Sequence, residues 1–168
     1  PKGYSLQSTD DFISILKCTK HEGLLASLDV ESLFTNVPVE QTIDIILQRA
    51  YNHERLNAPK IPKNILAELL RACTTKAPFK SPEGKLYLQV DGVAMGSPLG
   101  PTFANFYMGH LEQDVLSKGN VTKPSIYCRY VDDIFIVVKD VQQIHELRHL
   151  IRTNSVLKFT YEMSIDNR

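Results

Sequence analysis

An acidic pair enclosed by two apolar runs constrains the fold more than any other feature of the chain. Residues 125–131 and 134–138 are rich in aromatic and β-branched side chains, which favour buried strands. Only Asp132 and Asp133 separate the runs, and a carboxylate is costly to bury without a compensating partner. The economical interpretation is a tight hairpin with both aspartates at or beside its tip. Taken alone, the pair is also explained as turn chemistry, because Asp tolerates the dihedral angles of turns.

A third acid weakens that alternative. Asp29 ends another apolar run, Leu24–Val30, and so poses the same structural problem. Carboxylates at adjoining strand ends can converge, and they repel one another unless a cation lies between them. Their oxygen atoms suit a hard divalent ion, Mg²⁺ first among them. Two such ions about 3.5–4 Å apart would serve an in-line phosphoryl displacement. This pattern predicts a metal site.

Capping and turn signals divide the rest of the chain into alternating helices and strands. Ser8 and the residues after it can cap a helix, and Pro38 and Pro62 each fit the first turn of another. The Gly- and Pro-dense residues 92–101 must be irregular. The expected order begins with a short helix through Phe12, Ile15 and Leu16, strand 24–30, turn 35–36 and helices after Pro38 and Pro62. It continues with hairpin 77–90, helix 102–117, the two strands around the acidic pair, helix 141–152 and strand 156–162. This order predicts an α+β fold, an antiparallel sheet with helices packed on one face.

Composition sets wider bounds. The chain has 168 residues, of which 43% are hydrophobic and 23% charged, as in an ordinary globular domain. No apolar run is long enough to cross a bilayer, so we expect no membrane partner. Three scattered cysteines without C-x-x-C spacing argue against a disulfide framework and a zinc knuckle, and suggest a reducing compartment. The chain starts without Met and stops within structured-looking sequence, so we expect a fragment of something larger.

Charge is balanced overall but unevenly distributed. The formal net charge is zero, whereas residues 60–85 carry six bases against two acids. This basic segment is a candidate for phosphate contacts, and the alternative is an ordinary solvated face. Its bases are Lys60, Lys63, Arg71, Lys76, Lys80 and Lys85.

Three segments follow one another along the chain: S-L-D-V-E-S-L-F-T-N-V-P at 27–38, G-V-A-M-G-S-P-L-G-P at 92–101 and Y-V-D-D at 130–133. In sequence and order, they resemble the motifs of reverse transcriptases. The wording L-F-T-N-V-P, M-G-S-P and L-K-F-T-Y-E is most similar to the Penelope-like retroelements. The resemblance runs over essentially the whole chain. It implies that residues 1–168 are a single polymerase palm with part of the fingers, without a thumb or an endonuclease domain.

The resemblance assigns roles to the acids and their neighbours. Asp29 and Asp132 would be the principal metal ligands, and Asp133 the third catalytic carboxylate. The backbone carbonyl of Val30 would contact the metal bound with the nucleotide. Phe34 matches the family's steric gate, where an aromatic ring crowds a ribose 2′-hydroxyl and selects deoxynucleotides.

The resemblance also implies contacts from the Gly-Pro loop. Gly92, Gly96 and Ser97-Pro98 match the pattern that holds the template and the incoming nucleotide. Met95 stands where many members carry Gln, and Gly100 where Ser is common. Lys158 lies in the region of a lysine that protonates the leaving pyrophosphate, although solvated lysine explains it as well.

The implied function is RNA-templated DNA synthesis. A primer 3′-hydroxyl would attack the α-phosphate of a deoxynucleotide with the help of two Mg²⁺ ions, for which Mn²⁺ can substitute. The expected partners are an RNA template, a DNA primer, a dNTP and the missing thumb and downstream domains. Family resemblance also suggests the nucleus. Two alternatives stay open: a silent nucleic-acid-binding palm relic, and a nucleotidyl cyclase, which would need neither Phe34 nor the Gly-Pro loop.

Residues 145–149, H-E-L-R-H, formally match a zinc-protease motif. The extended motif would need Gly at position 152 and His at position 155, where the chain has Arg152 and Ser155. Four apolar residues form an ordinary core-facing stripe, namely Ile144, Leu147, Leu150 and Ile151. We therefore expect a structural helix with its histidines on the flank or in solvent.

Overall fold

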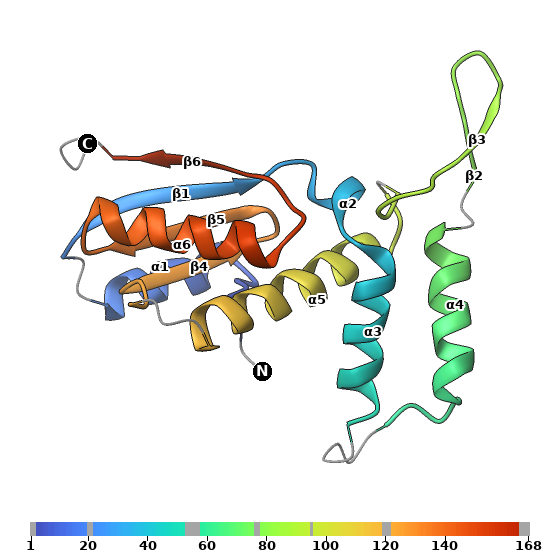
Figure 1. Cartoon of the computed structure of the whole chain (residues 1–168), viewed down its shortest axis with the longest axis horizontal. Coiled ribbons are helices and arrows are strands. Elements are labelled where there is room, and N and C mark those ends of the chain that lie inside the picture. Colours follow the sequence, from blue (N-terminus) through green and yellow to red (C-terminus); the bar gives the residue numbers. More distant parts are fainter. Residues whose placement is uncertain are drawn as a thin grey trace. The chain divides into compact units, whose positions relative to one another are not determined.

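The computed structural model describes residues 3–19, 22–52, 58–75, 78–94, 96–118 and 122–164. The chain divides into two compact units (Figure 1). The first unit combines Pro1–Glu31 with Gly109–Arg168, and the second is Ser32–Met108. Among the described residues, no helix is both long enough and apolar enough to span a membrane.

The first unit contains a four-stranded antiparallel sheet in the order β4-β5-β1-β6 (Figure 1). Its strands are β1 (Leu24–Val30), β4 (Ile126–Tyr130), β5 (Asp133–Val138) and β6 (Phe159–Met163). Tyr130 pairs with Asp133, so only Val131 and Asp132 form the loop between β4 and β5. The predicted tight hairpin with the two acids at or beside its tip is confirmed.

Helix α6 (Val141–Asn154) covers one face of this sheet. Asp140 caps the helix, because its side chain accepts a hydrogen bond from the Gln143 N–H at 2.9 Å. The guanidinium of Arg148 in α6 lies 3.6 Å from the ring centroid of Tyr161 in β6. Tyr161 pairs with Leu28, so both side chains project to the face of the sheet that α6 covers. Of the predicted stripe, Ile144, Leu147 and Ile151 are buried in α6, whereas Leu150 is half-buried.

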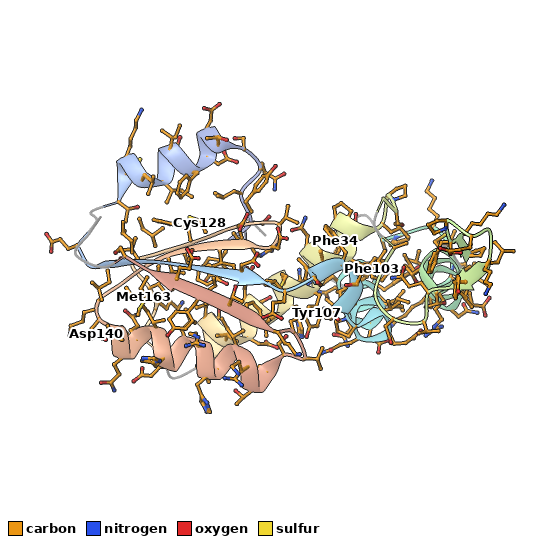
Figure 2. The ribbon with its side chains drawn as sticks, turned by 90° about the horizontal axis from the view of Figure 1, so that it is seen from above. Phe34, Phe103, Tyr107, Cys128, Asp140 and Met163 are labelled. Atoms are coloured by element: carbon orange, nitrogen blue, oxygen red, sulfur yellow. The ribbon has the colours of Figure 1, made fainter. Side chains whose placement is uncertain are left out.

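Helix α1 (Thr9–Cys18) packs on the opposite face, as Figure 2 shows. Its apolar residues Phe12, Ile15 and Leu16 contact Ile126, Cys128 and Val137 of the sheet. The α+β fold with an antiparallel sheet is confirmed, but helices lie on both faces rather than on one. The reason is that β4 and β5 also carry apolar residues on their second face, which must be covered.

The second unit is mostly helical. Its elements are α2 (Leu33–Asn36), α3 (Val39–Ala50), α4 (Lys63–Thr75), β2 (Pro78–Lys80), β3 (Leu86–Leu88) and the start of α5 (Gly100–Gln113). The predicted turn at 35–36 is the second half of α2, and Pro38 is the residue before α3 rather than in its first turn. The helix expected over 102–117 begins at Gly100 and ends as a π-helix, η1 (Asp114–Lys118), in the first unit.

Candidate functional site

Three acids that are distant in sequence lie at one end of the antiparallel sheet. Asp29, the next-to-last residue of β1, is opposite Asp133, the first residue of β5. Asp132 is the second residue of the hairpin loop. The Val30 N–H donates to the Asp132 carbonyl at 3.3 Å and ties this loop to the end of β1. The fold thus brings together the acids that the sequence predicted as metal ligands.

The electrostatics at this end of the sheet fit a cation. The pKa of the Asp29 carboxyl is raised, first by partial burial and then by the negative charges of Asp132, Asp133 and Glu31. A bound divalent ion would relieve this repulsion. Among the described residues, no three His, Cys, Asp or Glu side chains form a ready-made metal cluster. The ligand roles of the three acids and of the Val30 carbonyl therefore stay predictions.

The hairpin loop has an unusual backbone. Val131 has a φ of 58°, a left-handed conformation that a β-branched residue rarely adopts. A positive φ at the first of two loop residues is the pattern of a type II′ turn, where Gly is the usual occupant. Such strain persists only where the surrounding structure holds it.

A buried ion pair beside this loop was not predicted from the sequence. Arg129 of β4 and Glu112 of α5 are 1% and 3% exposed. The Arg129 Nε donates to Glu112 Oε1 at 2.5 Å, and its Nη1 donates to the Val131 carbonyl at 2.9 Å. The sequence did indicate such a pair, because Arg129 interrupts an apolar strand and a buried charge requires a partner. Spacing could not identify that partner, which lies 17 residues away on another element.

Lys158 lies beside the end of β1. The Glu31 N–H donates to the Lys158 carbonyl at 3.0 Å, which continues the pairing of Asp29 with Thr160. The Lys158 side chain is exposed. Lys158 therefore lies opposite Glu31, two positions beyond Asp29. Its role as a proton donor stays a prediction.

In the second unit, Phe34 contacts the Gly-Pro loop at two points. The Val93 N–H donates to the Phe34 carbonyl at 2.7 Å. At the other end of the loop, a Cβ on Gly100 would lie 3.4 Å from Cδ1 of the Phe34 ring. The ring is half-buried and is labelled in Figure 2. The predicted steric gate is therefore next to the loop that the sequence predicted as a nucleotide contact.

The predicted nucleotide-contact residues form the turn that leads into α5. Ser97 Oγ accepts from the Leu99 N–H at 3.3 Å, and the Ser97 carbonyl accepts from the Gly100 N–H at 3.0 Å. Gly96 has a φ of +84° and Pro98 is exposed. The turn is ordered by its own backbone bonds, and contact with a nucleotide stays a prediction.

The basic segment is only partly available to a ligand. Arg71 forms an ion pair with Glu40 at 2.8 Å, so its charge is used within the second unit. Lys76, like Met95 of the Gly-Pro loop, lies outside the described residues. The exposed bases are Lys60, Lys63, Lys80 and Lys85.

The zinc-protease motif lies on the exposed side of α6. His145 and His149 are both exposed, and Glu146 accepts a hydrogen bond from the Gln142 side chain at 3.0 Å. No third ligand joins them within the part of the chain that the structure describes. The motif belongs to an amphipathic structural helix.

A mainly apolar cavity of about 490 Å³ in the first unit is lined by one of the three acids, Asp133. Its lining includes Phe12 of α1 and Cys128, Asp133 and Phe135 of the sheet. The cavity therefore lies on the face that carries α1.

Comparisons with known proteins agree with the motifs. The family model described as "Reverse transcriptase (RNA-dependent DNA polymerase)" matches residues 2–165. Apo telomerase from Candida tropicalis, truncated from the C-terminal domain, has a TM-score of 0.66 and 16% identity, over 96% of this chain and 36% of that chain. Telomerase from Candida albicans with a TWJ fragment of telomeric RNA has a TM-score of 0.69 and 14% identity, over 95% and 31%. This chain thus spans about a third of those proteins. No curated protein matches it.

Proposed function

Since this chain belongs to the reverse transcriptase (RNA-dependent DNA polymerase) family and has the palm fold of its structural neighbours, we propose that it carries the catalytic carboxylates of RNA-templated DNA synthesis. The observation that carries the proposal is the register of β1 and β5, with Asp29 opposite Asp133 and Asp132 in the adjoining loop. The telomerase from Candida albicans was solved with telomeric RNA, which supports an RNA template here.

In the proposed reaction, the 3′-oxygen of a DNA primer bonds to the α-phosphorus of a dNTP. The bond from that phosphorus to the bridging oxygen breaks, and pyrophosphate leaves. Asp29 and Asp132 would hold the divalent ions, with Asp133 and the Val30 carbonyl beside them. Bound Mg²⁺ would supply charge stabilisation and activation of the attacking oxygen. Lys158 would hold a proton for the leaving pyrophosphate.

The second unit would supply the nucleotide contacts. The Phe34 ring would exclude a ribose 2′-hydroxyl, and residues 96–98 would support the incoming nucleotide. The exposed bases Lys60, Lys63, Lys80 and Lys85 would contact phosphates, so their contribution should weaken as salt concentration rises.

The finer identity is also a proposal. The wording of the motifs supports a Penelope-like retroelement, acting in the nucleus as part of a longer polypeptide with a thumb. The first unit would be the palm, and the second would include part of the fingers.

Metal binding and primer extension test the function. We expect saturable Mn²⁺ binding, measured by paramagnetic line broadening, that Asp29→Asn and Asp132→Asn each abolish. His145→Ala with His149→Ala is the matched control and should leave binding unchanged. In the full-length protein, the same aspartate variants should abolish primer extension with dNTPs on RNA. Mn²⁺ binding without extension would favour a silent relic, whereas broadening confined to His145 and His149 would contradict the proposal.

A further inference from the structure

We propose that Arg129, held by Glu112, is a positioning residue that fixes the hairpin loop and thereby the carboxylate of Asp132. This inference rests on the proposed function, because it concerns the same acids. Arg129 acts through the backbone of Val131, the residue before Asp132.

The backbone of Arg129 is held by hydrogen bonds on both sides of β4. Its backbone N–H donates to the Tyr4 carbonyl at 2.8 Å, and its carbonyl accepts from the Leu6 N–H at 2.7 Å. On the other side, β4 pairs Arg129 with Ile134 of β5. Arg129 is therefore hydrogen-bonded to a neighbouring segment on each side of β4, and it lies on a strand rather than on a loop.

The Arg129 guanidinium is paired with the buried carboxylate of Glu112. Glu112 accepts from Arg129 Nε at 2.5 Å and from Nη2 at 3.4 Å. The Tyr127 hydroxyl donates to the same carboxylate at 3.4 Å. Since both charged side chains are almost fully buried, rotation of either would leave a charge without compensation. The guanidinium thus has a single favourable orientation.

In this orientation, the Arg129 guanidinium also bonds the hairpin loop. Nη1 donates to the Val131 carbonyl at 2.9 Å, and Val131 is the loop residue with a φ of 58°. Strain of this kind needs an external restraint, and a charge-assisted hydrogen bond supplies one. The Val131 carbonyl belongs to the peptide group that leads directly into Asp132. The need to fill buried space does not explain this arrangement. Two apolar side chains would fill the same space, but neither could donate a hydrogen bond to the loop.

The test must separate positioning from stability. In the variant Glu112→Leu/Tyr127→Phe/Arg129→Met, apolar side chains replace the whole polar group, an exchange that often leaves stability equal or higher. We expect this variant to keep the thermal midpoint of the full chain and to lose Mn²⁺ affinity by about 10-fold or more. Arg129→Lys should lose part of the Mn²⁺ affinity, because one ammonium cannot bridge the Glu112 carboxylate and the Val131 carbonyl. It also serves as the second variant if the triple one fails to fold.

Gln143→Ala is the matched control. Gln143 is buried, and its side chain bonds the Lys139 N–H and the Thr122 carbonyl beyond the opposite end of β5 from the acids. Its loss should lower the thermal midpoint without changing Mn²⁺ affinity. Unchanged Mn²⁺ affinity in both Arg129 variants would overturn the positioning role.

A readout without metal distinguishes this inference from the proposed function. Amide hydrogen exchange of Val131, Asp132 and Asp133 should be faster in both Arg129 variants and unchanged in Gln143→Ala. If the unsubstituted chain binds no Mn²⁺, the proposed function fails, and the exchange rates alone decide the role of Arg129. Equal exchange rates in all proteins would contradict it.

Discussion

Gly92 and Gly96 share a positive φ but have different surroundings. Gly92 has a φ of +66°, and a Cβ there would collide with the backbone carbonyls of Phe34 and Thr35. Gly96 has a φ of +84° with open space around its Cβ position. Gly100 has only ordinary contacts, 3.4 Å and more, with the Phe34 ring and Ala94. Of the three, only Gly92 has both strain and a clash.

Alanine substitutions should therefore rank in a fixed order. Gly96→Ala should cost about 1–2 kcal/mol of unfolding free energy, the usual penalty for a left-handed residue. Gly92→Ala should cost clearly more, and Gly100→Ala should be close to neutral. Urea denaturation of the three variants would check the order. Equal losses at positions 92 and 96 would mean that the loop does not pack on Phe34 as described.

Phe34 allows a test of nucleotide selection. Because its ring would exclude the 2′-hydroxyl, Phe34→Val should raise kcat/KM for ribonucleotides relative to deoxynucleotides by at least about 10-fold. Phe106→Val is the control, since it removes a half-buried ring of the same unit that stacks on Arg49 instead. The measurement is single-nucleotide extension by the full-length protein. An equal change in both variants would rule out a gate at Phe34.

At the scale of elements, the two helices that cover the sheet differ in how firmly they are held. Helix α1 has no fully buried residue, whereas α6 buries Gln143, Ile144, Leu147 and Ile151. Since local opening is easiest where few apolar groups are buried, α1 should open first. Hydrogen exchange followed by mass spectrometry should show faster exchange for residues 12–18 than for 145–151. Equal protection would mean that α1 unfolds only together with the sheet.

At the scale of the whole molecule, the three cysteines report on cooperative unfolding. Cys18 and Cys73 are exposed, whereas Cys128 is buried, and burial raises the pKa of its thiol. The thiolate is the reactive form, so Cys128 should be doubly protected. Iodoacetamide at pH 8 should modify Cys18 and Cys73 quickly and Cys128 only at the rate of unfolding. Fast modification of Cys128 in the folded chain would show that the cavity admits the reagent freely.

Local pattern was sufficient to predict much of the fold. The apolar runs around Asp132 and Asp133 predicted the hairpin, because only a tight turn can join strands that close together. Ser8 predicted the start of α1, since its side chain accepts from the Asp11 N–H. These inferences succeeded because hairpins and helix caps depend on residues that are neighbours in sequence.

The sequence by itself determined which three acids are candidates for the site, the hairpin that carries two of them and the family to which the motifs belong. Only the tertiary structure decided that Asp29 is opposite Asp133, that Glu112 is the partner of Arg129 and that α1 covers the second face of the sheet. Each of these is a contact between segments far apart along the chain. Spacing carries no information about which buried charge neutralises another, because that choice depends on where the packed elements place their side chains.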